Sequence, residues 1–256
     1  MKKDVAVSSL FLSKFTEKFF TKFQIKKFAF TLAETLVVMG IIGIVAALTI
    51  PNLNQSTGDR EKVAKLKKVY SNLEDAFGRA TAVYGPLETW FVNDPVDFKS
   101  RNTRFANRIT EFMKVSKNCG YEGAGCFAND ARSLDGSEAI SPLEWTDDPM
   151  VLLADGTALD FNVEQTDYVQ IYVDIDGVKG SNTYGKDIFQ IDIDENGAVL
   201  RERNFSNEKL KTDCFASGSF CTAWVIDVGN MDYLKADRNG KCPNGTQLSW
   251  ENTSCK

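Results

Sequence analysis

The sequence predicts an α+β protein, in which a long N-terminal α-helix packs on a small antiparallel β-sheet head with a disulfide-rich C-terminal region. Three observations predict this fold class. An apolar run at residues 30–50 precedes a helical repeat of apolar residues that continues to Tyr84. Apolar and polar residues alternate, as in half-buried strands, in segments between 150 and 203. All six cysteines lie after residue 110.

The chain of 256 residues is long enough for one globular domain with additional segments. Its patterns divide it into four parts. These are a basic segment at 1–29, a transmembrane or core helix at 30–51, an amphipathic second half of that helix at 52–84, and a globular α+β head at 85–256.

Charge and composition exclude several classes of function. The first 29 residues carry seven lysines against two acidic residues, whereas the whole chain has a net charge of −5. A basic start before an apolar run is typical of the cytoplasmic side of a membrane. The acidic remainder argues against nucleic-acid binding, which needs a basic face. The chain has no histidine, which excludes His-based triads, His general bases and His metal ligands.

The apolar run from Phe30 to Ile50 has 21 residues and a single charge, Glu34. At about 1.5 Å per residue, a helix of this length spans about 30 Å, the thickness of a bilayer's hydrocarbon core. The run therefore predicts a transmembrane helix. A cleaved secretory signal is the alternative, but Ala46-Ala47 lies inside the run and no such site follows it. A carboxylate inside an apolar run is costly and is usually functional, so Glu34 needs an explanation.

A short motif surrounds the start of this run. The basic leader ends in Lys26-Lys27-Phe28-Ala29, the sequence Phe-Thr-Leu-Ala-Glu occupies 30–34, and Pro51 follows the apolar run. This stretch resembles the N-terminus of the type IV pilin and type II secretion pseudopilin superfamily. Counted from Phe30, Glu34 is the fifth residue and Pro51 the twenty-second, where pilins commonly carry Glu and Pro. Two departures are Ala29 in place of the usual Gly and a leader that is long for this family.

The resemblance implies a chemistry, a set of partners and a location. A prepilin peptidase would cut between Ala29 and Phe30 on the cytoplasmic face and methylate the new amine of Phe30. Glu34 would offset that amine's charge in a neighbouring subunit of a homo-oligomeric helical filament. Before assembly, the chain would cross the bacterial inner membrane once, with a cytoplasmic N-terminus and an extracytoplasmic head. Pilus or type II secretion machinery would then build it into a periplasmic or cell-surface filament.

Three functional classes remain open from the sequence. The first is a structural subunit of a type IV pilus-like filament, serving adhesion, motility, DNA uptake or surface display. The second is a type II secretion pseudopilin, whose short periplasmic filament helps to expel folded proteins. The third is a membrane-anchored enzyme or binding domain. No nucleophile–base arrangement or phosphate-binding loop is visible in the sequence, so we expect no enzymatic activity.

The helix is expected to continue beyond the apolar run. Pro51 removes a helix hydrogen bond and predicts a kink or local melting, so we expect an interrupted helix from about 30 to 84. Apolar residues then recur at helical spacing up to Gly85-Pro86, which ends the helix. A basic stripe in this segment is expected to lie on the solvated or membrane-proximal side. Its members are Lys62, Lys65, Lys67 and Lys68.

The head is expected to be a meander of three to five antiparallel strands. A short helix is predicted at 103–116 and a hairpin at 150–163, around Asp155-Gly156. Alternating segments at 168–177 and 187–194 predict two further strands, and Asn196-Gly197 turns the chain into a last one at 198–203. The tail from residue 204 on is expected to form loops held by disulfides.

The six cysteines indicate disulfides in an oxidising compartment, because they are even in number and follow a membrane-span candidate. Reduced buried thiols are the alternative. A zinc site is not indicated, since the chain has neither a CxxC motif nor a histidine. Six cysteines permit fifteen connectivities, and the simplest of these joins neighbours in sequence. The predicted pairs are Cys119 with Cys126, Cys214 with Cys221, and Cys242 with Cys255.

A loop rich in oxygen-bearing side chains lies between two predicted strands. Asp174, Asp176, Asn182 and Asp187 supply hard oxygen ligands of the kind that calcium prefers. Some pseudopilins have a calcium site in this part of the head, so the resemblance also points to calcium as a possible cofactor. The alternative is a solvated loop built from residues that favour turns. A second acidic run, at 192–197, is interpreted as a hairpin turn.

Overall fold

The computed structural model describes part of the chain: residues 31–91, 97–165, 168–179 and 182–255, without the side chains at 48–56 and at Gln165. The chain divides into two compact units, residues 1–53 and 54–256. The leader predicted at 1–29, including Ala29, and the predicted new N-terminus Phe30 lie outside the described residues. Cleavage and methylation at that junction therefore stay predictions.

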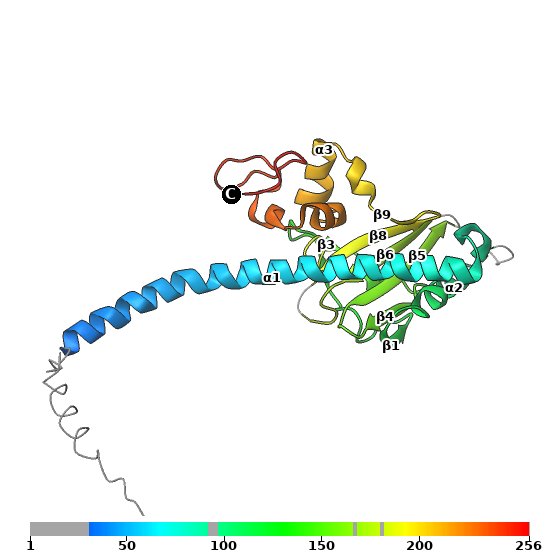
Figure 1. Cartoon of the computed structure of the whole chain (residues 1–256), viewed down its shortest axis with the longest axis horizontal. Helices are drawn as coiled ribbons and strands as arrows, with labels where there is room; N and C mark the ends of the chain where they lie inside the picture. Colours follow the sequence, from blue (N-terminus) through cyan, green and yellow to red (C-terminus); the bar gives the residue numbers. More distant parts are fainter. Residues whose placement is uncertain (1–30, 92–96, 166–167, 180–181, 256) are drawn as a thin grey trace, which may run out of the picture. The chain divides into compact units, whose positions relative to one another are not determined.

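Helix α1 runs from Leu32 to Tyr84 as one element of 53 residues (Figure 1). The local melting predicted at Pro51 is wrong, because helical backbone continues through that residue. A proline removes one hydrogen bond from the helix and leaves those on either side available, so a helix can continue past it. The kink stays a prediction. Gly85 follows the last helical residue, and its φ of 82° is the left-handed conformation that commonly follows a helix.

The first unit contains the beginning of α1. Its large apolar side chains from Leu32 to Val45 are between 52% and 80% exposed. Among the residues that the structure describes, no helix is long and apolar enough to cross a membrane. The membrane span predicted at 30–50 begins and ends outside the described side chains and stays a prediction.

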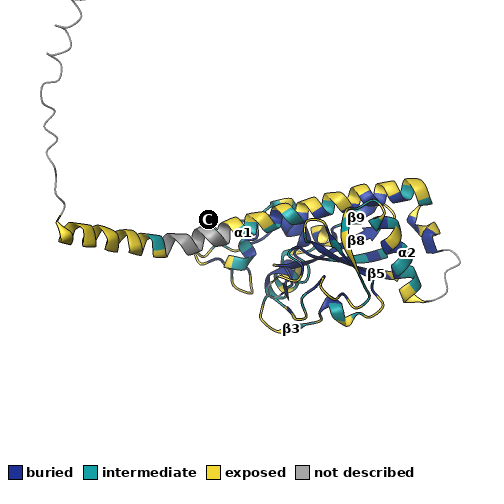
Figure 2. Cartoon of the chain, turned by 90° about the horizontal axis from the view of Figure 1, so that it is seen from below, coloured by how far each residue is buried: buried dark blue, intermediate teal, exposed yellow. Residues whose placement is uncertain are grey.

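In the second unit, α1 buries the apolar stripe that the sequence predicted. The inward side chains lie in one core with the sheet, and the opposite side of the helix is exposed, as Figure 2 shows by colour. Helical spacing at three and four residues places them on one face, which explains why this half of α1 packs while its other face stays polar. The buried members are Val63, Leu66, Val69, Leu73, Ala76, Phe77 and Ala80.

The main sheet has six strands in the order β1-β4-β5-β6-β8-β9, and every neighbouring pair is antiparallel. The strands are β1 (Val115–Gly120), β4 (Met150–Leu153), β5 (Ala158–Gln165), β6 (Tyr168–Asp174), β8 (Ile188–Asp194) and β9 (Gly197–Val199). The fold is therefore α+β with an antiparallel sheet, as predicted. The predicted hairpins at Asp155-Gly156 and Asn196-Gly197 are both present.

Three details of the predicted head are corrected. The sheet has six strands where three to five were predicted, because β1 is an edge strand of mostly polar residues without alternation. The last strand ends at Val199 and gives way to the 3₁₀ helix η3 (Arg201–Asn204). Helix α2 (Phe98–Thr110) begins five residues before its predicted start, because the side chain of Asp97 accepts hydrogen bonds from the first backbone N–H groups.

Short elements complete the head. A three-stranded sheet has the order β3-β2-β7, with β3 (Glu138–Ala139) antiparallel to β2 (Ala131–Arg132) and β7 (Asn182–Thr183) parallel to it. The 3₁₀ helix η1 (Leu87–Phe91) precedes α2 in sequence, and the 3₁₀ helix η2 (Pro142–Glu144) follows β3. Trp90 of η1 is fully buried, with its ring against those of Phe77 and Phe105.

The C-terminal region contains helical turns where the sequence predicted loops. It comprises α3 (Asn207–Leu210), η4 (Lys211–Ala216), η5 (Trp224–Val228) and η6 (Asp232–Lys235). The ring of Trp224 lies against those of Phe215, Tyr233 and Trp250, so these turns enclose an aromatic cluster. Such turns lack the long periodicity by which a helix is predicted from sequence.

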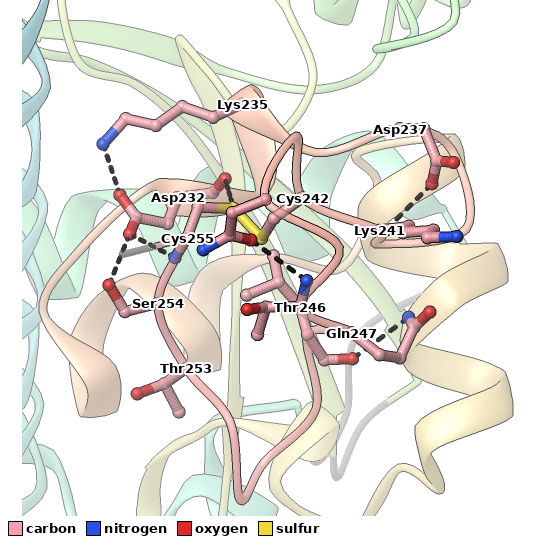
Figure 3. The surroundings of a disulfide bond; sticks show 12 residues. Asp232, Lys235, Asp237, Lys241, Cys242, Thr246, Gln247, Thr253, Ser254 and Cys255 are labelled. Atoms are coloured by element: carbon pink, nitrogen blue, oxygen red, sulfur yellow. Dashed lines mark hydrogen bonds and ion pairs between the residues drawn. A yellow bond between two sulfur atoms is a disulfide. The ribbon is translucent and has the colours of Figure 1, made fainter.

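All three predicted disulfides are present. Cys119 is bonded to Cys126, Cys214 to Cys221, and Cys242 to Cys255, and no described cysteine is free. The last disulfide closes a loop of 13 residues next to the end of the chain. Figure 3 shows it beside Asp232, whose carboxylate accepts hydrogen bonds from the Cys255 N–H, the Ser254 hydroxyl and the Lys235 ammonium. The disulfide and this carboxylate together hold the C-terminal segment on η6.

Candidate functional site

The first candidate site is the N-terminal turn of α1, where Thr31 and Glu34 are bonded to each other. Glu34 Oε2 accepts hydrogen bonds of 2.8 Å from both the backbone N–H and the hydroxyl of Thr31. In return, the Glu34 N–H donates to Thr31 Oγ1 over 3.2 Å. The pattern Thr-x-x-Glu at a helix start is a capping box, in which the two residues satisfy each other's backbone N–H groups.

This geometry gives Glu34 a partner within its own chain, which the sequence interpretation missed. The signal was available, since Thr31 precedes Glu34 by three residues at the start of an apolar helix. A carboxylate at a helix N-terminus is also favoured by the helix dipole. The single charge of the apolar run is therefore part of the cap in the first turn of α1.

The second candidate site is the acidic loop between β6 and β8, which includes the four predicted calcium ligands. Asp174 is fully buried, and its Oδ1 accepts hydrogen bonds from the N–H groups of Asp176 (3.1 Å) and Gly177 (2.9 Å). Burial raises the pKa of Asp174 to about 8. Gly177 has a φ of 64°, and a Cβ there would lie 2.8 Å from the Gly156 carbonyl oxygen, so the turn requires glycine.

Lys62 of α1 reaches this loop. Its ammonium forms an ion pair with Asp187 and lies 3.9 Å from Asp176 Oδ2. The last lysine of the stripe, Lys68, pairs with Asp155 at 2.7 Å. The expectation that the basic stripe lies on the solvated or membrane-proximal side is wrong for Lys62, whose side chain is 21% exposed, because tertiary packing brings carboxylates of the head against α1. Lys68 is paired but stays 58% exposed.

The loop's remaining polar atoms are only partly satisfied. Among the described residues, Asp174 Oδ2, Asp176 Oδ1 and both side-chain polar atoms of Asn182 are buried without a hydrogen-bond partner. Asn182 lies on β7, and Asp187 faces Lys62. Within the described part of the chain, no three His, Cys, Asp or Glu side chains are grouped so that they would hold a metal ion. The buried oxygen atoms without hydrogen-bond partners thus favour the calcium prediction. The described residues do not, however, form a ligand cluster that would hold the ion.

Comparisons with known proteins identify no relative of this chain. No protein-family model matches it, and no curated protein or solved structure matches it either. Any conclusion about function therefore rests on the residues and their geometry.

Proposed function

We propose that this chain is a structural subunit of a type IV pilus-like filament, made as a prepilin and assembled through its N-terminal helix. The observation that carries the proposal is the start of α1. There, exposed apolar side chains of α1 point to all sides of the helix, and the one charged residue among them, Glu34, lies in the first turn. The resemblance of residues 26–51 to prepilin N-termini supports the same conclusion.

The exposed side chains at the start of α1 favour burial in an apolar environment. Large apolar residues occur on every side of this segment, so no single face is the packing face. A helix that is apolar all round is buried in a membrane or among other helices. Each such side chain gains roughly 1.5–3 kcal/mol on full burial, so membrane insertion followed by packing in a filament has a strong driving force. The exposed members are Leu32, Leu36, Val37, Val38, Met39, Ile41, Ile42, Ile44 and Val45.

The proposed partners follow from this route. A prepilin peptidase cuts between Ala29 and Phe30 and methylates the amine of Phe30, so the peptidase is the enzyme and this chain its substrate. The chain is held in the inner membrane until the assembly machinery extracts it. In the filament, Glu34 of one copy pairs with the amine of Phe30 of the next. Two desolvated opposite charges attract strongly, and each is costly when left alone, so the pair sets the register between subunits.

Mass spectrometry of the mature protein tests the processing step. We expect an N-terminal peptide that begins at Phe30 and carries one added methyl group. The same gene expressed in a host without a prepilin peptidase is the matched control, and its product should retain Ala29 and the residues before it. A mature chain that begins at Met1, or after residue 50, would contradict the proposal.

A type II secretion pseudopilin is the second candidate, and the acidic loop favours it. Unpartnered buried oxygens of Asp174, Asp176 and Asn182 are the kind of ligand that a calcium ion satisfies. For calcium to bind there, the Lys62 ammonium must move away from Asp187. Calcium binding at this loop is a prediction that separates the two candidates.

Calorimetric titration of the protein with calcium tests this prediction. We expect saturable binding and a raised melting temperature in calcium, both lost in Asp174→Asn. The matched control is Asp130→Asn, which changes an exposed aspartate outside the loop and should bind like the wild type. No heat of binding and no shift in melting temperature would eliminate the calcium site.

A further inference from the structure

Two buried carboxyl groups, those of Asp148 and Asp160, lie outside the sites described above. Asp160 of β5 is fully buried, and neither of its carboxyl oxygens has a hydrogen-bond partner among the described residues. Asp148, in the segment before β4, is 3% exposed, and its Oδ2 likewise has no partner there. Three carboxyl oxygens without partners in a protein interior require an explanation, because buried polar groups are almost always satisfied.

The strand register brings the two residues together. Met150 lies opposite Asp160 across the β4–β5 pair, and the Phe161 N–H donates to the Pro149 carbonyl over 3.3 Å. Continued by two residues beyond the Met150–Asp160 pair, this register places Asp148 opposite Asn162. Asp160 is then the diagonal neighbour of Asp148 on the same face of the sheet. Diagonal neighbours in antiparallel strands lie within reach of each other's side chains.

Asp148 is also connected to α2. The side-chain N–H₂ of Asn102 donates to Asp148 Oδ1, and it donates to the Asp147 carbonyl over 3.2 Å. The carbonyl oxygen of the same Asn102 side chain accepts from the Val163 N–H over 2.8 Å. Asn102 is 1% exposed, so this connection is sealed from water.

The charged and titratable groups around the pair are mostly acidic. Besides burial, the charge of Asp147 raises the pKa of Asp148, and the charge of Asp148 raises the pKa of Asp160. Tyr172 of β6 lies opposite Asp160. Burial raises the pKa of Tyr172, and so do both carboxyls of the pair, Asp192 of β8 and Glu164 of β5. Two ionised carboxylates buried among such neighbours repel each other, and the neutral Asn102 amide compensates only one oxygen of Asp148, so full ionisation of the pair is too costly for a stable interior.

We propose that Asp148 and Asp160 share one proton in the folded head, with the Asp160 hydroxyl donating to Asp148 Oδ2. The proton completes a chain of hydrogen bonds that runs from Asp160 through Asp148 and Asn102 to the Val163 N–H. This chain, which we call the carboxyl clasp, fastens α2 and the segment before β4 to β5. It satisfies Asp148 Oδ2 and one oxygen of Asp160, and it leaves a single negative charge on the pair.

The clasp makes the stability of the head depend on pH. Burial raises the pKa of Asp148 to about 7 and the pKa of Asp160 well above its ordinary value. In the unfolded chain both carboxyls titrate near pH ~4. The folded state therefore keeps a proton that the unfolded state releases. The stabilising contribution is complete below about pH 4 and is lost as the pH rises through the raised pKa of Asp160, which carries the shared proton.

Thermal and denaturant unfolding between about pH 5 and 9 test the proposal with the variant Asp160→Asn. The side-chain amide introduced by this substitution donates to the Asp148 carboxylate without needing a proton, so the clasp should persist at high pH. Between about pH 5 and 7, we expect each added pH unit to raise the wild-type unfolding equilibrium constant by up to about tenfold relative to that of the variant. Asp130→Asn, at an exposed site, should keep the wild-type pH dependence.

A second variant and a spectroscopic readout cover the case in which Asp160→Asn does not fold. In Asp148→Asn, the amide donates to Asp160 while its oxygen still accepts from Asn102, so the pH dependence should again flatten. In the wild type, infrared difference spectra at neutral pH should show a protonated carboxylic acid that is reduced in either variant. Identical pH dependence in wild type and both variants would overturn the proposal. Stabilisation of the wild type by calcium that Asp160→Asn abolishes would also overturn it, since a metal ion would then occupy the pair.

Discussion

Replacing Glu34 by alanine is expected to abolish filament assembly while the head melts at the wild-type temperature. Glu34 lies in unit 1–53, whereas the buried core lies in residues 54–255, so the substitution removes no core contact. In the filament, however, the amine of Phe30 would be left desolvated without a counter-charge, and a buried charge that loses its partner is strongly destabilising. Filament yield in the sheared fraction and electron microscopy of the cell surface measure the outcome.

Two further variants separate the role of Glu34 in its own helix from its role between subunits. Glu34→Gln keeps a side chain that can accept from the Thr31 N–H but removes the charge. Thr31→Ala removes the hydroxyl of the capping box and keeps the carboxylate. If charge pairing governs assembly, Glu34→Gln fails like Glu34→Ala, and Thr31→Ala assembles. Normal filaments from Glu34→Gln would show that capping alone is required and would refute the pairing.

Removing the disulfide between Cys242 and Cys255 is expected to cost about 3 kcal/mol of unfolding free energy, on the chain-entropy estimate for its 13-residue loop. The double variant Cys242→Ser/Cys255→Ser avoids an unpaired thiol. Without the disulfide, the Cys255 N–H is held on η6 mainly by the Asp232 carboxylate. Hydrogen exchange at residues 253–255 should therefore accelerate. Chemical denaturation and exchange mass spectrometry give the two readouts.

The matched control removes a shorter crosslink. Cys119→Ser/Cys126→Ser opens a loop of 7 residues and is expected to cost about 2 kcal/mol. It should leave exchange at 253–255 unchanged, because that disulfide packs in a separate cluster with Phe127, Met150 and Ala158. A loss below about 1 kcal/mol for the Cys242–Cys255 variant, with unaltered exchange at the C-terminus, would show that the disulfide is not what holds this segment.

Local signals accounted for much of the head. Helical spacing identified the buried stripe from Val63 to Ala80, and Asp155-Gly156 and Asn196-Gly197 identified two hairpins, because turn chemistry and periodicity act over a few residues. Neighbouring cysteines predicted all three disulfides. The polar edge strand β1 was missed, since an exposed edge shows no alternation. The helical turns after residue 204 were missed because each is too short to show a period.

The candidate sites depended more on tertiary structure. The motif around Phe30 and Glu34 is contiguous, so the sequence alone identified the segment proposed for processing and assembly. It also contained the capping box, which became evident from the bonds between Thr31 and Glu34. By contrast, no local rule pairs Lys62 with Asp187, which lie 125 residues apart.

Residues that are close together in the chain were enough to predict the fold class, the long helix with its apolar start and the resemblance on which the proposed function rests. The sequence favoured the pairing of neighbouring cysteines among fifteen possible connectivities, and the structure decided it. Which charges meet and which are buried depended instead on long-range packing. That packing brought Lys62 to the acidic loop and brought Asn102 of α2 into a hydrogen bond with Asp148. The reason is physical: burial and long-range contact set the energy of a charge, and neither is encoded in the spacing of neighbouring residues.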